Sequence, residues 1–184
     1  IFSPRERDWQ KNEIIVDNDT PKQNGTYVEA NDAGKWKDSG SGFAQLKTTY
    51  LDYDTPFADG SARENITVKP GDKHSSIIWT PNMQYPGEYA VYVSYKTLPN
   101  SINDATYIVM HEGSATTFRV NQKMGGGTWV YLGTYEFEQG QRSNQMVILT
   151  NQSEHTGVVS ADAVRFGGGS AIISRGDSAA IYTS

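Results

Sequence analysis

Short runs of apolar residues at alternating positions dominate the second half of the chain. Turn-forming residues separate them, and the runs are SSIIW (75–79), EYAVYVSY (88–95), ATYIVMHE (105–112), TTFRVN (116–121), WVYLGTYEF (129–137), QMVILT (145–150) and VVSADAVRF (158–166). A period of two with many β-branched and aromatic residues predicts β-strands. Because no segment shows the 3.6-residue period of a helix, the chain is predicted to be an all-β, antiparallel β-sandwich.

Two of these runs allow a more detailed prediction. EYAVYVSY places Tyr89, Val91, Val93 and Tyr95 on one side of the strand, so this side is expected to face the core. The runs 105–112 and 116–121 are separated by a short segment that contains Gly113. This spacing predicts a β-hairpin with a glycine-containing turn.

The first half of the chain has fewer such runs. EIIVD (13–17) predicts the first strand, and between residues 26 and 71 only TYVEA (26–30) and NITVK (65–69) are candidates. Clusters of Gly, Asp, Ser and Pro separate them, so this part is expected to be rich in loops, where binding sites often lie. The sandwich is predicted to span 13–169, between an N-terminal linker (1–12) and a C-terminal linker (170–184) towards a further domain.

Composition narrows the function classes. The 184 residues suit one domain, the formal charge is −5, and there is no cysteine. The charge argues against electrostatic binding of nucleic acid or an anionic membrane, and the missing cysteine excludes disulfides and thiolate metal sites. No apolar run approaches the roughly 20 residues that span a bilayer. A signal peptide, if the gene encodes one, would lie upstream of Ile1.

Familiar catalytic motifs do not fit. His111-Glu112 begins like a zinc-protease motif, but Ala115 stands where the second histidine is required. Ser41 lacks the glycine that should stand two residues before a nucleophile elbow serine. The three histidines lie in different predicted strands or loops, so no catalytic residue is assigned.

Two pairs of acids stand out in the loop-rich part. Asp17 and Asp19 lie in VDNDTP, and Asp52 and Asp54 lie in LDYDTP. Such acids can bind a structural Ca²⁺ through oxygen ligands, but surface turns that favour Asp are the preferred explanation. A third possibility is the carboxylate pair of a glycosidase, but the sequence does not set the distance between two carboxyl groups.

Loop aromatics are the candidate ligand-binding residues. Trp36, Tyr50 and Tyr53 are expected to stack on the apolar faces of sugar rings, with Asp52 and Asp54 as hydrogen-bond acceptors. The alternative is that each aromatic residue packs its loop onto the sandwich.

Several segments in a fixed order resemble a known family. These are VDNDTP, Trp36, PGEYAVYVSY, the 105–122 hairpin, GGGTWVYLGTYEFEQG and ADAVRF. Over roughly 13–167 the chain resembles the golvesin C-terminal-like domain, also labelled a xanthan lyase carbohydrate-binding-like domain. The resemblance implies a jelly-roll, galactose-binding-like sandwich without catalytic residues. It also implies an accessory unit of exported bacterial proteins, beside a lyase, hydrolase or amidase domain, with polysaccharide or peptidoglycan as partner.

Three residues near the end of the predicted sandwich are assigned structural roles. Trp129 opens the aromatic run 129–137, and ADAVRF places Asp162 and Arg165 inside the last strand. A buried acid without partners is costly, so Asp162 is expected to accept hydrogen bonds and fix a loop at one end of the sandwich. Asp162 as a ligand residue is the alternative.

Three functional hypotheses follow. The leading one is a non-catalytic module that binds glycan. The second is a rigid spacer that packs against a neighbouring domain, and the third is a polysaccharide lyase or hydrolase in its own right. Exposed coplanar aromatics favour binding and an apolar patch favours packing. A cleft with two facing acids, or with a Tyr beside a His or Arg, favours catalysis.

Overall fold

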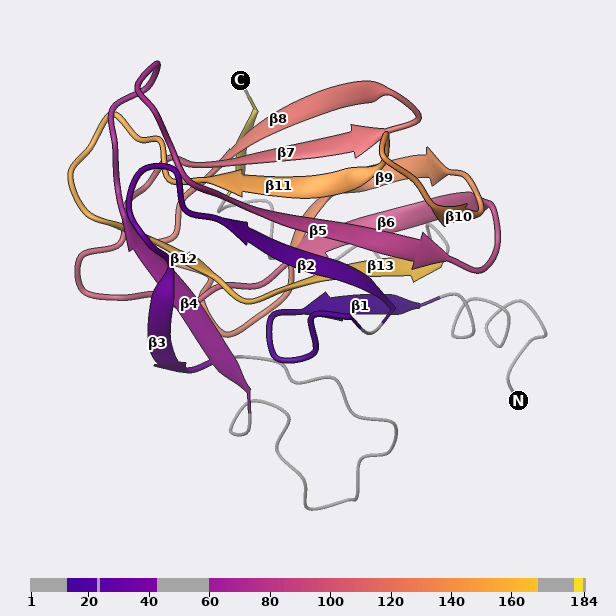
Figure 1. Cartoon of the computed structure of the whole chain (residues 1–184), viewed down its shortest axis with the longest axis horizontal. Helices are drawn as coiled ribbons and strands as arrows, with labels where there is room; N and C mark the ends of the chain where they lie inside the picture. Colours follow the sequence, from indigo (N-terminus) through magenta and orange to yellow (C-terminus); the bar gives the residue numbers. More distant parts are fainter. Residues whose placement is uncertain (1–12, 23, 43–59, 169–180, 184) are drawn as a thin grey trace.

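The computed structural model describes residues 13–22, 24–42, 60–168 and 181–183, and this part of the chain contains strands and no helix (Figure 1). The strands are β1 (Ile14–Asp17), β2 (Gly25–Ala30), β3 (Lys37–Ser41), β4 (Ser61–Ile66), β5 (Ser76–Met83), β6 (Gly87–Val93), β7 (Ala105–His111), β8 (Ser114–Val120), β9 (Val130–Phe137), β10 (Gly140–Gln141), β11 (Met146–Thr150), β12 (Val158–Ala161), β13 (Ala163–Gly168) and β14 (Ile181–Thr183). The predicted all-β, antiparallel architecture is confirmed.

The strands form two main sheets and a smaller one. The first has the order β1-β13-β6-β9, and the second has the order β10-β5-β11-β7-β8-β14, with β2 also paired to β5. The third sheet has the order β12-β4-β3. Buried side chains of both main sheets form one core, in which Trp79 and Tyr107 stack at 6.4 Å and Phe137 meets Phe166 edge to face at 5.6 Å. Aromatic pairs of this geometry stabilise a core beyond the apolar area that they bury.

β6, an inner strand of the first main sheet, is buried on both faces. Tyr89, Val91 and Val93 of β6 are buried, as the alternation predicts. Tyr92, on the opposite face, is also only 2% exposed, and the guanidinium of Arg165 lies over its ring at 5.1 Å from the centroid. The alternation in the sequence predicted one buried face of β6, and the second face, which carries Tyr92, is buried as well.

The predicted hairpin is present as β7 and β8, with His111 opposite Ser114. The two turn residues between them, Glu112 and Gly113, have φ values of 52° and 83°. Two successive positive φ values are the signature of a type I′ turn, whose twist matches that of the flanking strands.

The run VVSADAVRF is two strands instead of the predicted single one. β12 belongs to the small sheet, β13 belongs to the first main sheet, and Asp162 separates them. At this point the backbone N–H of Asp162 donates to the carbonyl of Ser94, and the N–H of Ala163 donates to Oγ of Ser94. The acid inside the apolar run thus marks the residue at which the chain changes sheets.

Two further strands differ from the prediction. Lys37–Ser41 was expected to be loop because it is polar. It is mostly exposed, yet it pairs with β4 across an irregular register. β4 lies at 61–66, not 65–69. Both differences arise because pairing in the small sheet depends on tertiary contacts and not on an apolar period.

The predicted C-terminal linker, 170–184, includes three residues that the structure pairs with the edge of a sheet. Ile181, Tyr182 and Thr183 lie opposite Val120, Arg119 and Phe118 of β8. The predicted N-terminal linker, 1–12, and residues 170–180 lie outside the described residues. Within the described ranges, no helix has the length and hydropathy needed to cross a bilayer.

Candidate functional site

Trp36, the first predicted stacking residue, is only 4% exposed and belongs to the hydrophobic core. Its backbone N–H donates to Oδ1 of Asn31, and its carbonyl accepts from Nη2 of Arg63 at 3.0 Å. The ring therefore packs its loop onto the sandwich, which is the alternative that the sequence left open. It offers no free face to a sugar ring.

The other four predicted ligand-binding residues, Tyr50, Asp52, Tyr53 and Asp54, lie outside the described residues. The two positions that flank this segment are described and lie together, because the N–H of Gly42 donates to the carbonyl of Gly60 at 2.8 Å. A Cβ atom added at Gly42 would lie 2.7 Å from Oδ2 of Asp162. The flanking backbone thus packs directly against the acid at the sheet change.

Three carboxylates gather at this point and are called the carboxylate cluster. They are Asp17 at the end of β1, Asp19 in the following turn and Asp162 between β12 and β13, and one oxygen of each lies within 4.8 Å of the others. Asp17 and Asp162 are fully buried. Only the topology brings Asp162 to the other two, so the sequence predicted Asp17 and Asp19 as a pair and missed the third member.

Hydrogen bonds already engage part of the carboxylate cluster. Oδ2 of Asp19 accepts from the backbone N–H of Ser61 at 2.9 Å, and Oδ1 accepts from the Ser61 hydroxyl. Oδ1 of Asp17 accepts from the N–H of Asp19 at 3.2 Å. These bonds tie the turn after β1 to the first residue of β4.

The cluster has the donor chemistry of a calcium site. Carboxylate oxygens are preferred Ca²⁺ ligands, and the turn supplies two more buried oxygens, Oδ1 of Asn18 and Oγ1 of Thr20, that have no hydrogen-bond partner among the described residues. Ca²⁺ binding stays a prediction, and Asp17, Asp19 and Asp162 are the residues that would hold the ion.

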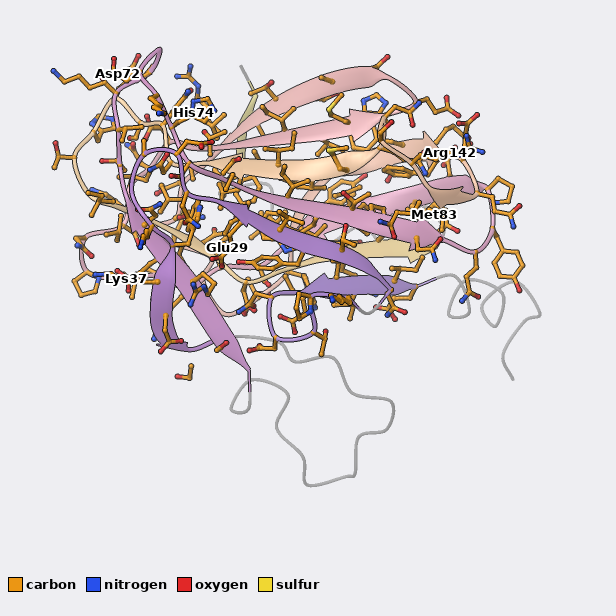
Figure 2. All side chains as sticks on the ribbon, viewed as in Figure 1. Glu29, Lys37, Asp72, His74, Met83 and Arg142 are labelled. Carbon is orange, nitrogen blue, oxygen red and sulfur yellow. The ribbon has the colours of Figure 1, made fainter. Side chains whose placement is uncertain are left out.

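A second polar group lies between β2 and β4. Arg63 donates from Nε to Oε2 of Glu29 at 2.7 Å and from Nη2 to Oε1 at 3.1 Å, and the Tyr27 hydroxyl donates to Oε2 at 2.5 Å (Figure 2 labels Glu29). Burial, reinforced by the neighbouring carboxylate of Glu29, raises the pKa of Tyr27 far above its ordinary value. Tyr27 therefore keeps its proton and acts as a donor.

The two other residues with predicted structural roles are Arg165 and Trp129. Arg165, on β13, forms an ion pair with Glu13 in addition to its contact with Tyr92. Trp129 lies directly before β9 and is partly buried. The positive charge of Arg165 within β13 is thus neutralised by Glu13, the residue directly before β1.

Comparison with known proteins identifies the family. The model of the Golvesin C-terminal domain matches residues 14–168. The chain belongs to the Golvesin C-terminal domain family. The resemblance seen in the sequence is thereby confirmed, and this Golvesin C-terminal domain covers nearly all of the described strands.

Two similar proteins place the domain within longer chains. A xanthan lyase of Bacillus sp. (strain GL1) is 33% identical over 96 residues, which are 52% of this chain and 10% of the lyase. The solved structure of a Paenibacillus xanthan lyase superposes with a TM-score of 0.63 at 26% identity, over 86% of this chain and 13% of the lyase. The chain thus spans about a tenth of the length of the relatives that it matches.

Proposed function

We propose that this Golvesin C-terminal domain is a non-catalytic accessory module that binds carbohydrate and positions a larger carbohydrate-active protein on its substrate. The observation that carries the proposal is the similarity to a small part of two xanthan lyases. A module that recurs within polysaccharide-degrading proteins, and that covers little of their length, fits a supporting role better than the reaction itself.

The chemistry of the described residues also supports a non-catalytic role. In the carboxylate cluster Asp17 and Asp162 are fully buried, so a polysaccharide cannot reach them. Tyr27 lies beside Arg63, but its raised pKa makes it a poor general base. Neither arrangement provides an acid and a base exposed to a substrate.

The relatives suggest where such a module works and what it contacts. Xanthan is a polysaccharide substrate of the two related lyases, as their names state. We therefore expect this chain to act outside the cytoplasm, on a polysaccharide or on the glycan of peptidoglycan. A neighbouring domain of the same chain is the expected protein partner.

A pull-down of the purified chain tests this proposal. The chain is incubated with insoluble peptidoglycan and with immobilised xanthan, cellulose and mannan, and the bound fraction is compared with that of Tyr50→Ala and Tyr53→Ala. Retention by one of these glycans supports a binding module, and its loss in the variants would assign the segment that contains Tyr50 to Asp54. If no glycan retains the folded chain, the binding proposal fails.

One observation favours the spacer alternative. On the outer side of the second main sheet, Val28, Ile78, Ile148 and Ile108 lie directly opposite one another across four strands. Val28 is 50% exposed, and contiguous apolar side chains on a surface often mark a protein interface. A spacer would bind none of the glycans, and Val28→Lys would weaken its contact with a neighbouring domain.

A further inference from the structure

An open hollow lies at the end of the sandwich where β5 leads into β6. The exposed side chains that line it share polar or aromatic chemistry and come from three separate segments; they are Glu13, Asn24, Asn82, Gln84 and Tyr85. The residue before Gln84, Met83, marks this end of β5 in Figure 2. The hollow encloses about 340 Å³ when the solvent at its mouth is included.

Tyr85 gives the hollow an aromatic surface. Its side chain is 52% exposed, which is more than any other Phe, Trp or Tyr side chain whose exposure is described. A tyrosine ring presents an apolar face with a polar edge, which suits a ligand that has both. Tyr85 is thus exposed, whereas Trp36 is buried.

Amide side chains line the same hollow as Tyr85. The side chains of Asn82 and Gln84 are exposed, and within the described part of the chain neither has a hydrogen-bond partner. Each amide offers a carbonyl acceptor and two N–H donors to a ligand. An amide of this kind can donate to one hydroxyl group and accept from its neighbour on a sugar ring.

The backbone beneath these groups is fixed. The hydroxyl of Tyr89 donates to the carbonyl of Tyr85 at 2.7 Å, and the N–H of Asn82 donates to the carbonyl of Asn24 at 2.9 Å. Asn24 adopts a φ of 61°, and a Cβ at Gly25 would lie 2.0 Å from the carbonyl oxygen of Thr80. The backbone that carries the lining residues is therefore held in place before a ligand arrives, so binding need not order it.

The charge of the lining selects the ligand class. Among the described residues that line the hollow there is no Lys, Arg or His, and the carboxylate of Glu13 is paired with Arg165. Within this described lining, an anionic sugar would meet no cationic side chain. The lining instead suits hydroxyl groups and the apolar face of an uncharged ring.

We infer that this hollow is a binding site for an uncharged sugar residue, in which Tyr85 stacks on the ring and Asn82 and Gln84 bond its hydroxyl groups. This inference rests on the proposed function, because it names the surface with which the module holds carbohydrate.

NMR titration of the ¹⁵N-labelled chain tests the site. Cellotetraose and mannotetraose are the uncharged probes, and tetragalacturonate is the charged probe of the same length. One uncharged probe is expected to shift the amide signals of residues 82–85 and 87–89. Tyr85→Ala is expected to weaken the binding of that probe by about tenfold, the effect of losing one aromatic contact. Gln84→Ala is expected to weaken it less.

Met124→Ala is the matched control, because Met124 is 43% exposed and its carbonyl contacts Tyr95, at the opposite end of β6 from Tyr89. Unchanged binding in Tyr85→Ala, or binding of tetragalacturonate alone, would overturn the site while leaving the module a carbohydrate binder. If no probe binds, the site is also overturned, and the pull-down then decides whether the proposed function falls with it.

Discussion

The two ends of this sandwich use polar residues in opposite ways. At the end that holds the carboxylate cluster, Asp17 and Asp162 are buried and Asp19 accepts a hydrogen bond from Ser61. At the other end, the amide side chains of Asn82 and Gln84 face solvent beside Tyr85. The first end is called the closed end and the second the open end.

The difference shows why polar residues in loops are poor evidence of a binding site when taken alone. Acids at the closed end look like ligands in the sequence, but both oxygens of Asp19 and Oδ1 of Asp17 accept hydrogen bonds from the protein itself. The sequence did not predict a site at the open end, because PNMQYPG (81–87) is typical of a turn. Only burial and hydrogen bonding distinguish the two ends, and variants at each end should therefore behave differently.

The largest loss of stability is expected when an asparagine at the closed end is replaced. Asn151 is fully buried, accepts from the N–H of Ser75 at 2.8 Å, and donates to the carbonyls of Ala33 and Ile66 at 3.0 and 2.9 Å. Asn151→Ala leaves these groups buried without partners and is expected to cost about 3 kcal/mol, or roughly 6–12 °C in Tm. Calorimetry measures the shift.

Asn82→Ala, at the open end, serves as the control for that variant. It removes an exposed amide and is expected to change the free energy of unfolding by less than about 0.5 kcal/mol. Equal losses in the two variants would contradict the distinction between the ends.

Alkaline pH is expected to destabilise the protein through its buried tyrosines. Burial raises the pKa of Tyr107 and Tyr27 well above the ordinary value, whereas both ionise near pH 10 when the chain is unfolded. Because the unfolded state releases these protons first, their contribution is fully present below pH 10 and is lost as pH rises above it, by about 1.4 kcal/mol per pH unit for each tyrosine.

Absorbance at 295 nm and circular dichroism followed together from pH 8 to 12.5 check this expectation. Part of the tyrosine ionisation should coincide with unfolding. Complete ionisation of the tyrosines in a chain that remains folded would contradict it.

A smaller effect is expected from Ca²⁺ at the carboxylate cluster. If the ion binds only the folded chain, and if 1 mM Ca²⁺ is about 100 times Kd, this concentration should raise Tm by about 5 °C. EDTA should reverse the rise. Asp19→Asn should reduce the response. An identical Tm in Ca²⁺ and in EDTA would assign the cluster to hydrogen bonding alone.

The smallest effect on stability is expected for the proposed sugar site. Tyr85→Ala and Gln84→Ala remove exposed side chains, so each should lower Tm by less than about 2 °C. Thermal unfolding of the variants, followed by circular dichroism, checks this. A large loss in either variant would mean that the open end is part of the fold and not a surface kept free for a ligand.

The sequence predicted the core strands well and the site poorly, for a physical reason. Runs such as 105–112 and 145–150 owe their strand character to alternating burial, and the observed strands 105–111 and 146–150 follow them closely. Lys37–Ser41 has no apolar period and was missed. The burial of Trp36 and the meeting of Asp162 with Asp17 depend on which segments become neighbours, and no local pattern carries that information.

The position of β13 also bears on how the chain acquires its structure. β13 is the second of the four strands in its sheet and separates β1, formed from the earliest described residues, from β6. Until residues 163–168 have left the ribosome, β1 lacks its partner in this sheet. The sheet therefore closes late in synthesis, through contacts between distant parts of the chain, and folding is expected to be slow for a domain of this size.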